Sequence, residues 1–155
     1  MSKQILRRRL CVATTLLLIT HPTLSAEGAP MIEVWKSPTC GCCKEWVRHM
    51  EQNGFSVKAN DTGNNGIRER LGLPRKYGAC HTAVVAGYVV EGHVPADDVA
   101  RLLKMKPNAL GIAVPRMPIG SPGMDGPAYG WRRDPYDVLL IHKDGTASVF
   151  QSHGK

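Results

Sequence analysis

The chain has 155 residues, of which 43% are hydrophobic and 21% are charged. This length fits one globular domain and is too short for two of ordinary size, and the plentiful valine, leucine and isoleucine exclude a chain that is disordered by composition. The formal net charge is +7 at pH 7, which on its own would be compatible with binding to nucleic acid.

Residues 1–26 have the layout of a secretory signal peptide, and we expect cleavage after Ala26. A cationic start with three consecutive arginines precedes an apolar run over residues 10–20. This run is about half the roughly 20 residues that a membrane span needs. The leader carries four basic residues and no acidic one, so the mature chain, residues 27–155, keeps a net charge of only +3. We therefore expect a single periplasmic domain with no nucleic-acid partner and no membrane attachment after cleavage.

The first half of the mature chain predicts alternating strands and helices. Residues 31–36 alternate imperfectly, as expected of a strand that is buried on both faces. After Ser37-Pro38-Thr39, apolar residues recur at the spacing of one helix face, and Gly54 provides a C-cap. The predicted elements are a strand over residues 31–36, a helix over 40–53, a strand over 55–59 and a short helix over 67–73.

The second half predicts a hairpin over residues 82–94, a helix between Pro95 and Pro107, and a terminal hairpin over 137–150. Residues 111–130 are dense in proline and glycine, so we expect no regular structure there. The order of elements predicts an α/β fold. It is a thioredoxin-like sheet with flanking helices, followed by a C-terminal Pro/Gly-rich loop and a β-hairpin.

The mature chain contains four cysteines: Cys40, Cys42, Cys43 and Cys80. Cys40 and Cys43 have C-x-x-C spacing at a strand-to-helix junction, where the positive end of the helix favours thiolate. Cys42 lies between them, and Cys80 precedes the predicted hairpin. In a thioredoxin-like fold the segment that enters this hairpin lies against the C-x-x-C pair, so we expect four sulfurs to converge.

Three interpretations of these cysteines compete. Two structural disulfides are the simplest, although the neighbours Cys42 and Cys43 cannot bridge each other without strain. A thiol–disulfide oxidoreductase uses Cys40 and Cys43 but leaves Cys42 and Cys80 without a role. A soft-metal site uses all four, since thiolates select Cu(I), zinc or iron–sulfur centres. Adjacent cysteines can hardly share one small tetrahedral ion but can hold different ions, so we favour several bridged Cu(I) ions over zinc.

Four further side chains are candidates for metal ligands or for supporting contacts. His81 adjoins Cys80, and His93 lies in the predicted hairpin. Met117 and Met124 flank the Pro/Gly-rich loop and carry soft thioethers that suit Cu(I). The other side chains of note are expected to be structural: Trp35, Trp46 and Trp131 in the core, Met50 on the helix face, His142 on a strand face and His153 in the tail.

Four motifs resemble those of the small CopG-type copper-resistance proteins and occur in the same order: TCGCCKEW, CHTAVV, GYVVEGHVPADD and AVPRMPIGSPGM. The resemblance covers about residues 31–151. It implies an exported thioredoxin-like protein of bacterial copper tolerance, with a polynuclear copper cluster bound by Cys40, Cys42, Cys43 and Cys80. The resemblance also carries over His93, Met117 and Met124. It leaves open whether the protein sequesters copper, passes it to other periplasmic copper-handling proteins or cycles it between oxidation states.

Overall fold

The computed structural model describes residues 30–154, which form a mixed α/β fold around a seven-stranded sheet. The predicted signal peptide and its cleavage point lie outside the described residues. Within the described part of the chain, no helix has the length and apolar character needed to cross a membrane.

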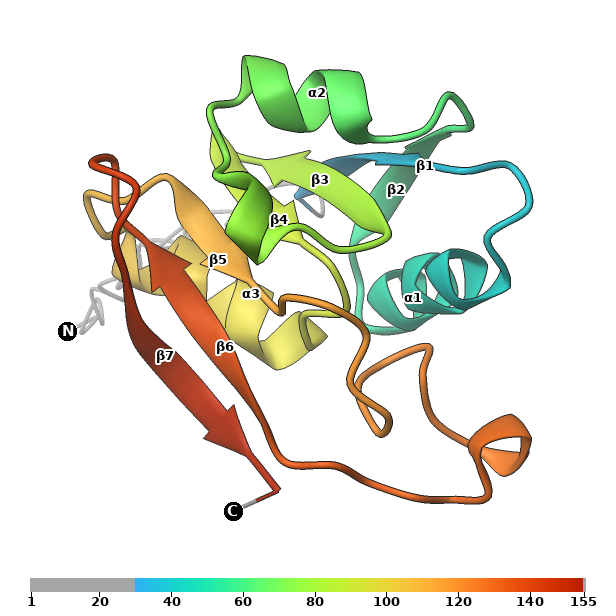
Figure 1. The fold of residues 1–155 in the computed structure, drawn as a ribbon. Helices are drawn as coiled ribbons and strands as arrows, with labels where there is room; N and C mark the ends of the chain where they lie inside the picture. The colour runs from blue at the N-terminus through green and yellow to red at the C-terminus, as the bar shows by residue number, and fades with distance from the viewer. Residues whose placement is uncertain (1–29, 155) are drawn as a thin grey trace, which may run out of the picture.

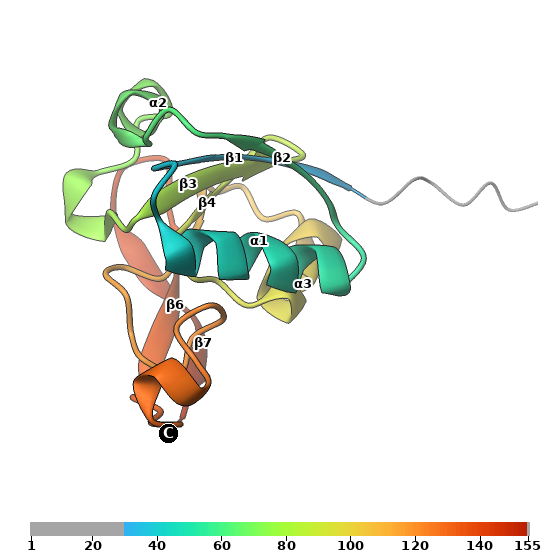
Figure 2. The same cartoon turned by 90° about the vertical axis from the view of Figure 1, so that its right-hand side faces the viewer.

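The sheet has the order β2-β1-β3-β4-β5-β6-β7 (Figure 1). Strands β1 and β2 are parallel, as are β4 and β5, and the other neighbours are antiparallel. Helices α1 and α3 lie along one face of the sheet and α2 lies on the opposite face (Figure 2). In chain order the elements are β1 (Met31–Lys36), α1 (Gly41–Gln52), β2 (Ser56–Asn60), α2 (Asn65–Arg70), the 3-10 helix η1 (Arg75–Tyr77), β3 (His81–Val85), β4 (Tyr88–Glu91), α3 (Ala96–Met105), β5 (Gly111–Ala113), the 3-10 helix η2 (Pro127–Tyr129), β6 (Tyr136–Ile141) and β7 (Ala147–His153).

The predicted α/β class is confirmed, and so is the order strand, helix, strand, short helix, hairpin, helix and terminal hairpin. The finer assignment to a thioredoxin-like fold stays a prediction. Element boundaries differ from the expected ones by a few residues, most clearly at α2, which begins at Asn65 and ends at Arg70.

The core lies between the sheet and the helices α1 and α3. Strand β1 buries alternate residues, so Ile32 and Val34 pack with Trp46 and Met50 of α1, and all four side chains are fully buried. The indole Nε1 of Trp46 donates a hydrogen bond to the Val94 carbonyl at 2.8 Å. This bond satisfies the polar group of a buried aromatic ring and fixes α1 against the segment that leads into α3.

The strand register determines where Cys80 lies. Lys36, the last residue of β1, pairs with His81, the first residue of β3. Cys80 directly precedes this pair on one strand, and the loop into α1 directly follows it on the other. The antiparallel register therefore brings Cys80 beside the start of α1.

The expectation of no regular structure in residues 111–130 is wrong at both ends of the segment. Gly111–Ala113 forms β5 and Pro127–Tyr129 forms η2. A Cβ atom at residue 111 would overlap the Val89 carbonyl oxygen of β4. Only glycine permits this close approach, which is why a strand of three residues can pair here in the parallel direction.

Two expectations about single side chains are also wrong. Trp131 is 71% exposed rather than buried in the core. Both Gly130 and Trp131 have left-handed backbones, with φ of 61° and 57°, at the turn that follows η2. His153 is not a loose tail residue, because it belongs to β7 and its Nε2 lies 2.7 Å from a carboxylate oxygen of Asp98 in α3.

Candidate metal centre

The start of α1 holds three of the four cysteines. Cys40 is the N-cap residue with an extended backbone, and its Sγ accepts from the Cys43 N–H at 3.3 Å. Its sulfur also lies 3.5 Å from the Cys42 Sγ. The three sulfurs therefore gather where the unpaired N–H groups of the helix create a positive potential that stabilises thiolates.

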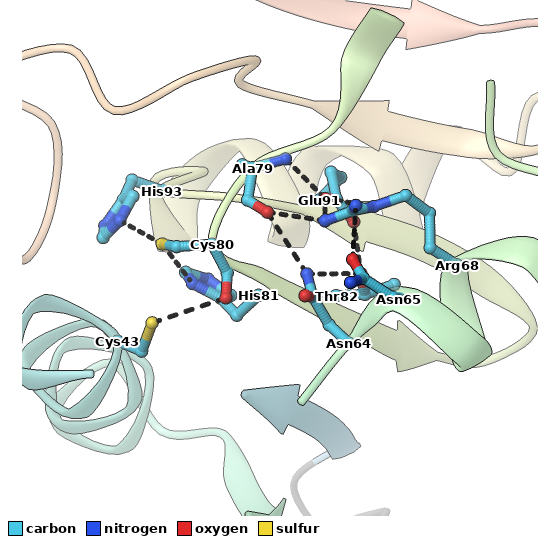
Figure 3. A network of polar contacts seen from close by, with 10 residues as sticks. All are labelled: Cys43, Asn64, Asn65, Arg68, Ala79, Cys80, His81, Thr82, Glu91 and His93. Carbon is cyan, nitrogen blue, oxygen red and sulfur yellow. Dashed lines mark hydrogen bonds and ion pairs between the residues drawn. The ribbon is translucent and has the colours of Figure 1, made fainter. Parts of the chain in front are cut away.

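Cys80 joins this group from the opposite side. The sulfurs of Cys40, Cys42, Cys43 and Cys80 all lie within 4.8 Å of one another. The Cys43 Sγ is also 3.7 Å from the Cys80 carbonyl oxygen, although the two residues are 37 positions apart in the sequence (Figure 3). The expected convergence of the four sulfurs is present in the structure.

The structure holds this cluster in a partly oxidised state. Cys40 and Cys43 form a disulfide, whereas Cys42 and Cys80 are free thiols. Two electrons and two protons convert the disulfide into two further thiols. Four thiolate ligands therefore require the reduced state.

His93 approaches the Cys80 sulfur with its Nε2 atom at 3.0 Å, and its Nδ1 atom lies 2.8 Å from the Pro122 carbonyl oxygen. A carbonyl oxygen only accepts hydrogen bonds, so Nδ1 carries the proton and the lone pair of a neutral His93 is on Nε2. The same pairing with a carbonyl orients histidine ligands in many metal sites. The structure thus orients His93 either to accept a hydrogen bond from the Cys80 thiol or to bind a metal beside it.

His81 is fully buried against the same sulfur. Its Nδ1 lies 3.4 Å from the Cys80 Sγ, and its ring contacts those of Trp46 and His93. Its Nε2 is buried and has no hydrogen-bond partner within the described residues. An unpaired buried nitrogen is costly, while Nδ1 is the nitrogen that faces the Cys80 sulfur.

The electrostatic environment keeps Cys80 and the two histidines of the site neutral when no metal is bound. Burial, followed by the adjacent Cys42 and by Glu91, raises the pKa of the Cys80 thiol to about 12. Burial lowers the pKa of His93, and it lowers the pKa of His81 well below the usual range, where the nearby His93 and Lys36 act in the same direction. Both imidazoles are therefore in the neutral form that binds metals.

The Pro/Gly-rich loop packs directly on the start of α1. A Cβ atom on Gly123 would lie 2.6 Å from the Cys42 carbonyl oxygen and 2.8 Å from the Trp46 nitrogen. The buried Met124 accepts a hydrogen bond at its Sδ from the Tyr129 hydroxyl at 3.4 Å. Met117 is exposed and lines, with Cys80, a pocket of about 400 Å³. The structure thus brings the loop to the cysteines, but it gives the two methionines different surroundings.

The donor set of the site is soft and borderline rather than hard. It combines four sulfurs with two imidazoles. The ligand atoms lie within 4.8 Å of one another in each of two sets, which are Cys40, Cys42, Cys43 and Cys80, and Cys80, His81 and His93. Carboxylates, the ligands of calcium and magnesium, are absent from these two sets. Such donors fit a soft or borderline ion such as Cu(I) or zinc.

Sequence reasoning missed the polar residues behind Cys80. Glu91 is fully buried at the end of β4, and it pairs with Arg68 of α2. A charged residue directly after the apolar stretch Tyr88–Val90 is the pattern that could have identified it. The role of Arg68 and Asn64 depends on tertiary contacts, and no local pattern indicates it.

The fold and the site together define an α/β protein whose cysteine and histidine cluster can bind a metal ion. Two solved structures, both named "Copper resistance protein copG" and described as Form 1 and Form 2, match the chain with a TM-score of 0.74 and 42% sequence identity. Each match covers 81% of this chain and 98% of the solved chain. The chain therefore belongs to the family of copper resistance protein CopG.

A family model adds a second, shorter match. Residues 77–124 match the family described as "Protein of unknown function, DUF411". This segment runs from Tyr77, the last residue of η1, to Met124, so it contains Cys80, His81, Glu91 and His93 but not the cysteines at the start of α1. No curated protein sequence matches the chain.

Proposed function

We propose that this protein binds several Cu(I) ions between Cys40, Cys42, Cys43 and Cys80 and thereby contributes to copper resistance. The observation that carries the proposal is the mutual distance of the four sulfurs, which is within 4.8 Å. A thiolate can bridge two ions, and Cu(I) accepts two or three sulfur ligands. Sulfurs within this distance could also surround one tetrahedral ion, so the adjacency of Cys42 and Cys43 favours the cluster: two neighbouring cysteines can hardly share one small ion but can hold different ions.

The residues around the sulfurs have complementary roles in this proposal. His93 is oriented by the Pro122 carbonyl so that its Nε2 lone pair faces the cluster, and His81 supplies a second buried imidazole. Met117 and Met124 are the thioether candidates on the loop that packs against α1. Cys80 is a thiol near neutral pH because its pKa is about 12, so copper binding releases its proton.

The proposal also has a cellular setting. The leader over residues 1–26 would export the chain to the periplasm, and residues 27–155 would act there as one domain. Copper ions are the proposed partner, with other periplasmic copper-handling proteins as donors or acceptors.

Metal analysis tests the proposal. The chain is reduced anaerobically, loaded with Cu(I), and assayed for bound copper and for free thiols. We expect more than one copper per chain and protection of all four thiols, with clear loss of copper in Cys42→Ser and Cys80→Ser. Met105→Leu, which removes an exposed sulfur at the end of α3, is the matched control. Unchanged copper content in Cys80→Ser would contradict the proposal.

Sequestration and copper redox cycling are separated by a mild oxidant. The loaded chain is oxidised, each Cu(I) that reacts gives one electron to the oxidant, and the Cu(II) formed is followed by electron paramagnetic resonance. Reversible oxidation with retained metal supports a redox role. Copper that stays Cu(I), or that is released, supports sequestration or transfer.

A second candidate function is thiol–disulfide exchange, which the Cys40–Cys43 disulfide at the start of α1 favours. An attacking thiolate would bond to one of these sulfurs and release the other as a thiolate. In that case Cys80→Ser keeps exchange activity toward a dithiol substrate and Cys43→Ser loses it. Loss of copper binding in Cys80→Ser with little exchange activity in the parent chain would eliminate this candidate.

A further inference from the structure

The peptide that precedes Cys80 is held by side chains on both of its polar groups. The Ala79 N–H donates to the Glu91 Oε1 at 2.6 Å, and the Ala79 carbonyl accepts from Arg68 and from the Asn64 Nδ2 at 3.2 Å (Figure 3). These side chains come from β4, from α2 and from the residue before α2. Ala79 lies outside the strands, so these contacts take the place of a sheet ladder in fixing its backbone.

The two charged members of this group form a buried ion pair. The Glu91 side chain is fully buried and that of Arg68 is 14% exposed, with 2.8 Å between the Arg68 Nη2 and the Glu91 Oε1. The second carboxylate oxygen of Glu91 accepts from the Thr82 hydroxyl at 2.5 Å. A buried pair of this kind adds little net stability, because the cost of desolvation offsets the attraction. The Arg68–Glu91 pair instead fixes one arrangement of the groups that it contacts.

Asn64 supports the same conclusion. It is the N-cap residue of α2, yet its side chain makes no capping hydrogen bond. The amide bonds instead to the Ala79 carbonyl and to the Thr82 hydroxyl, both at 3.2 Å. Asn64 therefore contacts Ala79 and Thr82, the residues on either side of Cys80 and His81, and does not cap α2.

We propose that Arg68, Glu91 and Asn64 are positioning residues for the metal centre. They fix the Ala79 peptide and thereby hold the Cys80 sulfur against His93 and the sulfurs of α1. The inference extends the proposed copper-binding function, since it assigns a role to residues that touch no metal ligand atom. Cys80 needs such support because it is a free thiol, while Cys40 and Cys43 are joined to each other.

A metal-free measurement tests this inference independently of copper. In a Cys42→Ser chain with the disulfide intact, Cys80 is the remaining free thiol of the described residues. Its rate of alkylation by iodoacetamide, divided by the thiolate fraction that the pH dependence of the rate gives, reports how firmly it is held. We expect Arg68→Gln to raise this rate about tenfold, the factor that corresponds to the loss of one hydrogen bond to a charged group. Arg68→Lys, which keeps the charge and one donor, should restore part of the protection.

Arg75→Gln is the matched control. Arg75 lines the same pocket as Arg68 and Cys80, but it is exposed and pairs with the exposed Glu69 at 3.3 Å. We expect it to leave the alkylation rate unchanged. Loss of thermal stability in Arg68→Gln with an alkylation rate equal to that of Arg75→Gln would overturn the inference, because the ion pair would then be only structural.

Copper binding provides the second readout. In the chain with all its cysteines, Arg68→Gln and Glu91→Gln should weaken Cu(I) binding by about 10- to 100-fold, as is typical when the support of a metal ligand is removed. They should also change the copper–thiolate absorption band, whereas Arg75→Gln should not. Wild-type affinity and absorption in both variants would overturn the inference. A parent chain that binds no copper would refute the proposed function and leave the alkylation test in force.

If Arg68→Gln or Glu91→Gln fails to fold, two milder variants test the same inference. Arg68→Lys and Asn64→Ala each disturb one of the two donors to the Ala79 carbonyl and leave Glu91 charged. Both should raise the alkylation rate above that of Arg75→Gln. Equal rates in all three chains would contradict the positioning role.

Discussion

At the scale of a single residue, protonation of the His49 imidazole affects the stability of the folded chain. Its Nε2 accepts a hydrogen bond at 3.1 Å from the N–H of Ala96, the first residue of α3. Only the neutral imidazole can accept this bond. Burial lowers the pKa of His49, and the nearby Asp125 and Asp97 only partly oppose this effect. The contact between α1 and α3 therefore depends on an unprotonated histidine.

The expected pH dependence follows from the direction of that shift. The pKa of His49 is about 6.5 in the unfolded chain and lower in the folded chain, so the unfolded state binds more protons between the two values. Stability is thus lost as the pH falls from about 6.5 toward the folded pKa. His49→Gln, whose amide oxygen can accept the Ala96 bond at any pH, should reduce this loss.

Melting temperatures at about pH 7.5 and about pH 5.5, on either side of the unfolded pKa, measure the effect. The difference between the two temperatures should be smaller in His49→Gln than in the parent chain. His142→Gln, at the residue that directly follows β6 in the terminal hairpin, is the control and should behave like the parent. Equal differences in all three chains would show that His49 does not carry the acid sensitivity.

Single side chains differ in how well the sequence predicts their surroundings. Trp46 and Met50 were predicted correctly as core residues because they share a helix face with Cys43. Trp131 was predicted wrongly, since its bulk gave no information about a left-handed turn that directs it to solvent. The periodic pattern of an element carries this information, and a loop has no such pattern.

At the scale of elements, the close contact between the Pro/Gly-rich loop and α1 depends on Gly123. Gly123→Ala would place a Cβ against the Cys42 carbonyl and the Trp46 nitrogen, at a residue whose φ is +83°. We expect a loss of about 1–3 kcal/mol of unfolding free energy from overpacking and backbone strain. The displaced loop should also move the Pro122 carbonyl away from His93 and weaken metal binding.

Urea denaturation and copper affinity measure the two effects. Gly54→Ala, at the other end of α1, has a similar φ of +85° but meets no atom within 4 Å. This control isolates the cost of the backbone conformation from the cost of the contact. If Gly54→Ala and Gly123→Ala lose equal stability and bind copper equally well, the loop does not support the metal centre.

Helices and hairpins with a clear apolar periodicity or turn signal were predicted almost completely. Elements that depend on contacts with residues far away in the sequence were not. The α1 and α3 helices and the two hairpins have repeating apolar positions or turn residues. Strand β5 has three residues, too few for a period, and it exists because Gly111 fits against Val89 of β4. The group formed by Asn64, Arg68 and Glu91 was missed for the same reason, because its members meet only in the folded chain.

At the scale of the whole molecule, the convergence of the sulfurs could be predicted from topology. A C-x-x-C pair after the first strand and a cysteine before the hairpin lie side by side once β1 and β3 pair in antiparallel register. The oxidation state could not be predicted, since the same spacing serves a disulfide and a set of metal ligands. Folding, cysteine oxidation and metal binding are therefore coupled through one small region.

This coupling predicts how copper changes the stability of the whole chain. The Cys40–Cys43 disulfide closes a loop with a sequence separation of 3. In the chain-entropy model, reduction of so short a loop costs about 2 kcal/mol of unfolding free energy. Cu(I) binds the folded, reduced chain more tightly than the unfolded chain, so it should restore this loss and exceed it. A free concentration of one hundred times Kd adds about 2.7 kcal/mol.

Anaerobic denaturation in urea, with Cu(I) set by a chelating buffer, measures these changes. The midpoint should fall on reduction, rise above that of the disulfide form when Cu(I) is added, and fall again when a strong Cu(I) chelator removes the metal. Cys80→Ser keeps Cys40 and Cys43, so it should show the same fall on reduction but little recovery with Cu(I). Equal recovery in Cys80→Ser would mean that the sulfurs of α1 bind copper without Cys80, because the residue that completes the predicted cluster would then add nothing to the linkage between metal binding and folding.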